Sequence, residues 1–431
     1  MEGAKHRQMK YSHRIRGKTL KSSPPHRSRK KMWWLMATAC LIQTIGISQE
    51  LTRTKRDVNP EAHMNVSQMI VYRGYPSEEY EVLTEDNYYL TINRIPHGRR
   101  HLTDRGSKPV AFLQHGLFAD ASHWVLNMAN NSLGFILADA GYDVWLGNSR
   151  GTSWSRKHQN LSADEEKYWD FSFHEMGIYD LPAMINFVLK KTQQEQLYYV
   201  GHSQGCTIGF IAFSAIPELS QKIKMFFALA PVITTKHARS PTLKMLSFLP
   251  DFSYKDMPAS REFILSRKPM KDMITTLCRY VLTKKLCGHL LLFSSGYNPS
   301  NLNMSRIDVY AAHYPDGTSV KNILHWKQTT GLFRQFDYGS DNLMIYNQSY
   351  PPSYKVEDML APTAVWSGGN DLLASLEDTT VLLSRITNLV YQQKLSVWNH
   401  FDFIWGLRAS KHIYGKILQL MRKAQEINIL P

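Results

Sequence analysis

The stretch LYYVGHSQGCTIGFIAFS, residues 197–214, decides the fold of this chain. Residues 197–200 have the length and apolar composition of a buried strand, and an apolar helical run follows at 207–214. Between them lies Gly201-His202-Ser203-Gln204-Gly205, which fits the pattern Gly-x-Ser-x-Gly. A strand-to-helix turn this sharp leaves no room for side chains at 201 and 205, and it lifts the serine hydroxyl above the sheet edge. The stretch therefore predicts a nucleophilic Ser203.

Short apolar runs alternate with helical patterns on both sides of this turn. We expect a helix at 180–191 and strands at 110–114, 142–146, 197–200, 225–229, 363–366 and 394–397. Because apolar strands that alternate with helices form parallel sheets buried on both faces, the chain is predicted to be α/β with a mostly parallel central sheet.

The alternation stops between about residues 232 and 325. This stretch contains apolar helical pieces at 243–249 and 287–293 and no convincing strand. We interpret it as a helical cap or lid inserted above the sheet. Extra helices packed on the sheet are the alternative interpretation.

A serine hydroxyl is a weak nucleophile until a histidine removes its proton, and a carboxylate orients that histidine. In α/β hydrolases the chain order is serine, acid, histidine, each after a strand. Asp371 follows the strand at 363–366 and a glycine-containing turn, and His400 follows the strand at 394–397. The predicted catalytic residues are therefore Ser203, Asp371 and His400.

Three other residues compete for the acid and base positions. Asp378 falls within the helix that follows the turn, and Asp402 is better placed to cap the helix after His400. His412 lies in a C-terminal helical pattern at 411–421, which is the wrong place for a base.

The oxyanion formed in acyl transfer needs two N–H donors. The residue after the nucleophile supplies one, and a loop after an early strand supplies the other. Gln204 and Leu117 occupy these positions, and we expect His115 to pack under the turn and fix the Leu117 loop. This chemistry requires no metal and no organic cofactor.

With these residues in view, the chain resembles the mammalian acid lipases, the group of α/β hydrolases that contains lysosomal acid lipase and gastric lipase. The resemblance runs from about residue 59 to the C-terminus. The motifs that carry it are Asn59-Pro60-Glu61, Gly74-Tyr75-Pro76, Gln114-His115-Gly116-Leu117, Gly147-Asn148-Ser149-Arg150-Gly151, Gly201-His202-Ser203-Gln204-Gly205, Asn303-Met304-Ser305-Arg306 and His400-Phe401-Asp402-Phe403.

The resemblance implies an α/β-hydrolase fold with a lidded cap and the Ser203, Asp371 and His400 triad. It implies oxyanion donors at Leu117 and Gln204, and a cap disulfide between Cys278 and Cys287. It also implies triacylglycerols and cholesteryl esters as substrates, met at a lipid–water interface. No obligate protein partner is evident.

The chain departs from the family at several positions outside the triad. Thr152 replaces the usual Asn, Leu372 stands where many relatives carry Trp, and residues 408–410 replace Asp-Ala-Pro. The cap segment 257–261 lacks the usual Phe-Gly-Asp-Lys. These cap changes bear on substrate preference and on the lid.

The basic charge of the chain belongs to its N-terminus. Residues 1–56 contain 14 Lys and Arg against two Glu, so they hold +12 of the net charge of +15. The remainder has no basic stripe interleaved with aromatic residues, which argues against nucleic acid as a partner.

We interpret 1–31 as a basic extension, 32–49 as a signal peptide with its apolar run at 33–47, and 50–58 as a propeptide or linker before the hydrolase domain at 59–431. An uncleaved signal anchor is the alternative for 33–47.

A signal peptide places the chain in the secretory pathway, with the lysosomal lumen or the extracellular space as destination. Glycosylation triplets occur at Asn65, Asn130, Asn160, Asn303 and Asn347.

The cysteine content agrees with an oxidising compartment. Cys40 falls in the signal peptide, which leaves three cysteines and one possible pair. Cys278 and Cys287 are the natural pair. Nine residues of straight helix would separate them by about 13 Å, so the chain must turn between them. Cys206 is expected to be a small buried residue.

A serine triad alone equally suits a thioesterase or a peptidase. A catalytically weak lipid-binding protein on the same fold is the non-enzymatic alternative.

Overall fold

The structure is a computed structural model that describes residues 59–99, 106–247, 262–263, 268–278 and 280–427. The predicted N-terminal extension (1–31), signal peptide (32–49) and linker (50–58) lie outside these ranges, as does the cap segment 257–261. Within the described ranges, no helix combines the length and apolar character needed to cross a membrane.

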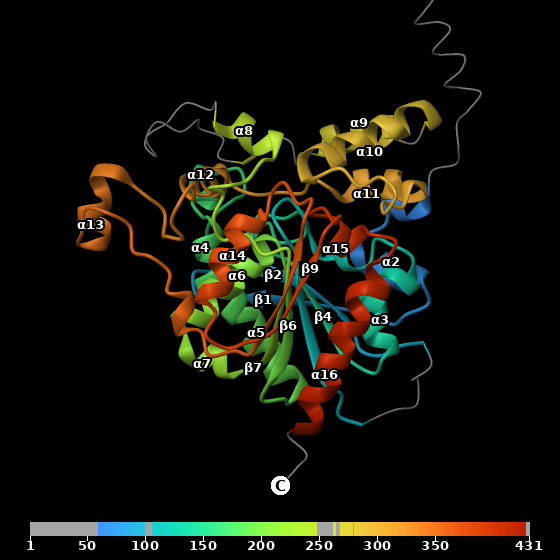
Figure 1. Ribbon diagram of the computed structural model, residues 1–431, viewed down its shortest axis with the longest axis horizontal. Coiled ribbons are helices and arrows are strands. Elements are labelled where there is room, and N and C mark those ends of the chain that lie inside the picture. The colour runs from blue at the N-terminus through green and yellow to red at the C-terminus, as the bar shows by residue number, and fades with distance from the viewer. Residues whose placement is uncertain (1–58, 100–105, 248–261, 264–267, 279, 428–431) are drawn as a thin grey trace, which may run out of the picture. The chain divides into compact units, whose positions relative to one another are not determined.

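A central sheet runs through the hydrolase domain (Figure 1). Its strand order is β1-β2-β4-β3-β6-β7-β8-β9, and the short β5 pairs with β2. The strands are β1 Glu78–Leu83, β2 Tyr88–Ile95, β3 Val110–Gln114, β4 Asp143–Gly147, β5 Lys157–His158, β6 Leu197–His202, β7 Ile223–Leu229, β8 Thr363–Gly368 and β9 Leu389–Leu395. β1, β2 and β4 pair antiparallel, β5 pairs antiparallel with β2, and the pairs from β4 through β3 to β9 are parallel. The predicted mostly parallel α/β sheet is confirmed.

The inner strands differ from the edge strands in burial. Every residue of β3, β4, β6 and β8 is buried, which is why these strands are apolar runs in the sequence. The strand predicted at 394–397 is wrong in position, because β9 ends at Leu395. β9 is an edge strand in which half-buried and exposed residues alternate, so its sequence contains polar residues and lacks the continuous apolar run of an inner strand.

Helices cover both faces of the sheet (Figure 1). On one side lie α3 (Leu133–Asp139) and α16 (Gly415–Ile427). On the other lie α5 (Leu181–Thr192), α6 (Gln204–Ala215) and α14 (Leu376–Arg385). The predicted helix after Ser203 exists, and it begins at once with Gln204 rather than at 207.

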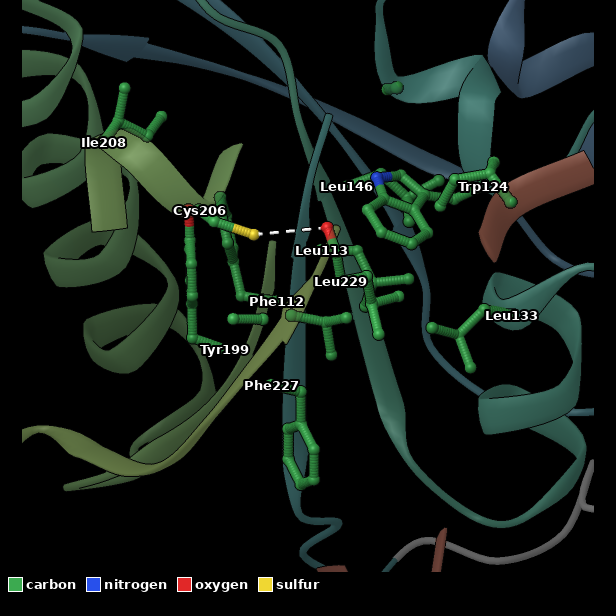
Figure 2. Packing of buried hydrophobic residues seen from close by; sticks show 14 of the residues in the cluster. Phe112, Leu113, Trp124, Leu133, Leu146, Tyr199, Cys206, Ile208, Phe227 and Leu229 are labelled. Atoms are coloured by element: carbon green, nitrogen blue, oxygen red, sulfur yellow. Dashed lines mark hydrogen bonds between the residues drawn. The ribbon is translucent and has the colours of Figure 1, made fainter. Parts of the chain in front are cut away.

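The strands between these layers form the core. Figure 2 shows Cys206 and Ile208 of α6 on one side of the inner strands and Trp124 and Leu133 on the other. The Cys206 thiol is fully buried and lies 3.5 Å from the carbonyl oxygen of Leu229. Cys206 is therefore the small buried residue that the sequence indicates.

Between β7 and β8 the described residues form helices and no strand, in agreement with the predicted helical cap. The helices include α8 (Pro241–Ser247), α9 (Lys268–Cys278), α10 (Val281–Ser295), α11 (Ile307–His313), α12 (Val320–Gln328) and α13 (Asn342–Tyr346). α8 to α11 stand at one end of the sheet (Figure 1). A disulfide joins Cys278 to Cys287, and the chain turns between α9 and α10 as that pairing requires.

Candidate active site

Ser203 occupies the turn between β6 and α6 with φ 54° and ψ −121°, a backbone conformation that non-glycine residues rarely adopt. Its N–H donates to the carbonyl of Leu229 at 3.0 Å. A Cβ at Gly205 would lie 2.3 Å from the Gln114 carbonyl oxygen, and one at Gly201 would lie 2.8 Å from the Cys206 nitrogen. The two glycines are therefore required by close packing, as predicted from the sequence.

Asp371 and His400 meet at this same edge of the sheet. Nδ1 of His400 lies 2.8 Å from Oδ2 of Asp371, and both side chains are buried. The other Asp371 oxygen accepts the N–H groups of Leu373 and Ala374 at 2.8 Å each. The carboxylate is thus fixed, and its bond to Nδ1 leaves Nε2 of His400 as the nitrogen able to take a proton.

The competing acids are engaged elsewhere. Asp378 lies in α14 and accepts from His237, with 2.9 Å between Oδ1 and Nδ1. The expectation that Asp402 caps a helix is wrong, because Phe401 holds the N-cap position of α15 (Asp402–Trp405). The Asp402 carboxylate instead accepts the N–H of Asn399 at 2.7 Å and so supports the turn that carries His400.

Of the two predicted oxyanion donors, Gln204 follows Ser203 directly in the chain, whereas Leu117 comes from a distant loop. The neighbouring Gly116 of that loop packs against Ser203, since a Cβ added at Gly116 would lie 2.8 Å from the Ser203 Cβ. Leu117 follows β3, and Gln204 is the first residue of α6. Leu117 and Ser203 line one cavity. Among the described residues neither the Leu117 N–H nor the Gln204 N–H donates to a protein acceptor, so both groups can donate to an oxyanion.

The Gln204 side chain is held by α12, which the sequence did not reveal. Its Oε1 accepts from Nδ2 of Asn322 at 3.0 Å and from Nε1 of Trp326 at 2.7 Å. The helical pattern of α12 predicts a helix, but nothing in it predicts this contact with a residue more than 100 positions earlier.

Buried histidines support the two loops around Ser203. Nε2 of His115 accepts the Ser149 N–H at 3.1 Å, and its Nδ1 donates to the Gly116 carbonyl at 2.8 Å. Burial lowers the pKa of His115 to about 4, so the ring is neutral at neutral pH. Nε2 of His202 donates to the His400 carbonyl at 2.9 Å, which ties the nucleophile turn to the histidine turn.

Ser203 and His400 open into a cavity of about 330 Å³. The other lining residues are mostly apolar or aromatic and include Leu117, Phe118, Val232, Leu243, Met245, Phe263, Tyr314, Pro315, Trp326, Leu373 and Phe401. A cavity of this kind suits a hydrocarbon chain next to a single polar reacting group.

The end of α10 is inserted between the turns that carry Asp371 and His400, a feature the sequence did not indicate. The Ser295 carbonyl accepts the N–H groups of Leu372 and His400, each at 3.2 Å. The Gly296 carbonyl accepts from Nδ2 of Asn399 at 2.8 Å. A cap helix therefore holds both halves of the Asp–His pair.

The glycosylation triplets differ in accessibility. Asn130, Asn160 and Asn347 are exposed, whereas Asn65 and Asn303 are half-buried. Nδ2 of Asn303 lies 3.4 Å from Oδ1 of Asn127. Glycosylation at these five residues stays a prediction, and the three exposed residues are the best candidates.

Comparison with known proteins agrees with this geometry. Residues 109–407 match a family model described as the alpha/beta hydrolase fold, and residues 66–128 match one described as a partial alpha/beta-hydrolase lipase region. Two crystal structures of proteins assigned as lipases share the fold. The Sulfolobus solfataricus protein has a TM-score of 0.55 at 12% identity, covering 80% of this chain and 94% of that one. The Acinetobacter baumannii protein has a TM-score of 0.52 at 16% identity, covering 86% and 98%.

The sequence relatives are much closer. Human lysosomal acid lipase/cholesteryl ester hydrolase is 56% identical over 92% of this chain and 100% of its own length. Mouse lipase member M is 51% identical over 93% and 95%. Rat gastric triacylglycerol lipase is 49% identical over 90% and 99%. The chain therefore belongs to the acid lipase family of α/β hydrolases, the family that contains lysosomal acid lipase and gastric lipase.

Proposed function

We propose that this chain is a carboxylic ester hydrolase that cleaves neutral lipids, triacylglycerols or cholesteryl esters, through an acyl-enzyme on Ser203. The observation that carries the proposal is the apolar cavity shared by Ser203 and by His400, whose ring is fixed by Asp371. The names of relatives that are 49–56% identical support the same substrate class.

The reaction proceeds in two halves. His400 removes the Ser203 proton, and Ser203 Oγ attacks the ester carbonyl carbon. The carbonyl oxygen becomes an oxyanion, which accepts from the Leu117 and Gln204 N–H groups. His400 then protonates the departing alcohol, and the acyl group remains on Ser203. Water, deprotonated by His400, attacks the acyl-enzyme. The bond to Ser203 Oγ breaks, His400 returns the proton to Oγ, and the fatty acid is released.

Substrate class follows from the cavity rather than from the triad. Its walls offer aliphatic and aromatic carbon, so an acyl chain gains free energy by leaving water, about 0.8 kcal/mol for each buried CH₂ group. Short polar acyl groups gain little from such walls. We therefore expect the turnover of long-chain esters to exceed that of short-chain esters.

The test uses purified protein with emulsified triolein and cholesteryl oleate from pH 4 to 8, and with a monomeric short-chain ester. Ser203→Ala should lose more than about 10³-fold of the activity on every substrate. Ser384→Ala, which changes an exposed serine on α14, is the matched control and should keep wild-type activity. Retained activity in Ser203→Ala would refute the assignment of the nucleophile. Preference for the short monomeric ester, with no gain at an interface, would refute the lipase assignment.

A fluorophosphonate probe separates an enzyme from a lipid-binding protein. It should label wild-type protein and fail to label Ser203→Ala. An unlabelled wild-type chain would favour the non-catalytic alternative.

We further propose that the protein enters the secretory pathway and acts in the lysosomal lumen or outside the cell. The apolar run at 33–47, the relatives' names and the Cys278–Cys287 bond support this location. Expression in cultured cells should yield protein whose mobility increases after glycosidase treatment. Protein that stays unglycosylated in the cytosol would contradict the proposal.

A further inference from the structure

The two candidate oxyanion donors lie far apart in the chain, yet one stretch of the cap contacts both. Leu117 follows β3, and Gln204 begins α6. Both N–H groups must point at a single oxygen atom, so their separation has to be held fixed. The stretch that meets both comprises residues 316–326, which includes most of α12, and we call it the 316–326 segment.

One end of the segment holds the Gln204 side chain. Oε1 of Gln204 accepts from Nδ2 of Asn322 at 3.0 Å and from Nε1 of Trp326 at 2.7 Å. An amide oxygen has two lone pairs, so these two donors satisfy it completely. The buried side chain therefore has one orientation, which in turn fixes the backbone that carries the Gln204 N–H.

The other end of the segment holds the loop of Leu117. Phe118, the next residue, has φ 60°, and its carbonyl accepts the Asp316 N–H at 2.6 Å. The Phe118 ring lies 5.0 Å from the Phe263 ring, measured between centroids, and the Phe263 N–H donates to the Thr318 carbonyl at 3.0 Å. The Leu117 loop is thus bound to the segment both directly and through Phe263.

The segment is itself fixed to the sheet domain. The buried Asp316 carboxylate accepts the Ser153 N–H, with 3.2 Å between nitrogen and Oδ2. Oδ1 of Asn322 accepts the N–H of Phe173, the first residue of α4 (Phe173–Glu175), at 2.8 Å. The segment can therefore serve as a rigid reference for both donors.

Trp326 has a second contact that makes its role separable by substitution. Its ring lines the cavity that holds Ser203, while its N–H is used on Gln204. A phenylalanine at this position would keep an aromatic wall and lose only the N–H.

We propose that the 316–326 segment positions both oxyanion donors, with Trp326 acting through Gln204 and Asp316 acting through the Leu117 loop. The inference rests on the proposed ester hydrolysis and adds two positioning residues to it. Because the oxyanion forms only near the transition state, a displaced donor lowers kcat and leaves substrate binding almost unchanged.

The test measures hydrolysis of a monomeric ester and the rate of fluorophosphonate labelling. Trp326→Phe should lower kcat about 10-fold, less than the ~100-fold or more that follows loss of a whole oxyanion donor, with KM within about twofold of wild type. Asp316→Ala should lower kcat by a similar factor. In both variants labelling should slow in parallel but reach the wild-type labelled fraction, whereas a folding defect would lower that fraction.

Two matched controls separate positioning from general stability. Trp366 of β8 also donates from Nε1 to a glutamine oxygen, Oε1 of Gln393 at 2.9 Å, but it does not line the cavity. Asp143 is another buried carboxylate, and its Oδ2 accepts from Nη2 of Arg94 at 2.7 Å. Trp366→Phe and Asp143→Ala should lose stability and keep kcat.

A double-mutant cycle tests whether Trp326 acts through Gln204. Gln204→Met removes Oε1 and keeps the backbone N–H, so the Trp326 N–H then has no side chain to hold. In that background Trp326→Phe should lower kcat by no more than about twofold further, whereas independent effects would multiply.

Three results would overturn the proposal: wild-type kcat in Trp326→Phe or Asp316→Ala, an equal loss of kcat in their matched controls, or losses that multiply in the double variant. If Gln204→Met or Asp316→Ala does not fold, the comparison of Trp326→Phe with Trp366→Phe decides the question. Wild-type protein that neither hydrolyses esters nor reacts with the probe would instead refute the proposed function.

Discussion

Gly296→Ala should lower the rate of ester hydrolysis by displacing the Asp371–His400 pair, although neither of these residues is substituted. Gly296 ends α10 with φ +114°, and its carbonyl holds Asn399, the neighbour of His400. An alanine Cβ at this position would lie 1.9 Å from the carbonyl oxygen of Asn370, the neighbour of Asp371. One added methyl group therefore pushes against the turn that presents Asp371, the proposed catalytic carboxylate.

The size of the effect follows from that distance. Real Cβ contacts stay beyond 3.0 Å, so α10 and the Asn370 turn must separate by about 1.1 Å. A displacement of about 1 Å in a catalytic group can lower the rate about 100-fold, which is ~2.7 kcal/mol in activation free energy. Because φ 114° with ψ 147° is a backbone region open almost only to glycine, alanine at this position adds a stability cost of about 1–3 kcal/mol.

The assay is steady-state hydrolysis of a monomeric ester, with active sites counted by a fluorophosphonate probe. We expect kcat to fall about 100-fold while KM stays nearly constant, because the displacement affects the catalytic pair and leaves the cavity walls in place. Gly141→Ala is the matched control, since Gly141 has φ +94° and no atom within 4 Å of the added Cβ. It should lose stability and keep kcat.

Two outcomes would refute this reasoning. One is a folded Gly296→Ala protein whose kcat lies within about threefold of wild type, far from the ~100-fold expected for such a displacement. The other is an equal loss of kcat in Gly141→Ala, which would make backbone strain the cause. If Gly296→Ala does not fold, Asn370→Ala provides a milder test, because it removes the 2.7 Å bond from Asn370 Nδ2 to the Tyr297 carbonyl. It should lower kcat more than it changes KM.

Three further predictions concern stability and reactivity. Burial raises the pKa of Asp402 to about 6 from 3.8, so the folded protein binds this proton more tightly than the unfolded chain does. The stability that the bound proton contributes is fully present below about pH 3.8 and is lost as pH rises toward 6. Asp402→Asn should therefore raise the thermal midpoint relative to wild type more at pH 7 than at pH 4, and a difference independent of pH would contradict this. Cys278→Ser/Cys287→Ser should lower the free energy of unfolding by about 2–3 kcal/mol in denaturant titrations, because the bond closes a short loop, whereas an unchanged midpoint would show that the bond adds nothing. Burial raises the pKa of the Cys206 thiol well above its usual value, so a thiol reagent should label it only in unfolded protein, and rapid labelling with loss of activity under native conditions would contradict its burial.

Several structural features were missed because they depend on segments distant in the chain. The bonds from Asn322 and Trp326 to Gln204 span 118 and 122 residues, and the bond from Asn399 to Gly296 spans 103. Such contacts leave no periodicity in either partner. β1 and β9 were missed or misplaced for another reason, because edge strands alternate between exposed and covered residues and lack the continuous apolar run of an inner strand.

The sequence by itself determined the turn around Ser203, the chain order of Asp371 and His400 and the parallel inner strands. These are local properties. Glycine is required at 201 and 205 because a Cβ there would collide with backbone atoms of the same strand–turn–helix unit or of the neighbouring strand. Only the tertiary structure decided three contacts: the bond from the Asn399 N–H to Asp402, the bonds from α12 to the Gln204 side chain, and the insertion of the end of α10 between the turns that carry Asp371 and His400. Leu286, Leu290 and Phe293 of α10 have the apolar spacing of a helix face in the sequence, yet the structure leaves all three exposed. Periodicity identifies an apolar face, but the packing of the other face decides whether it meets the core or the outside.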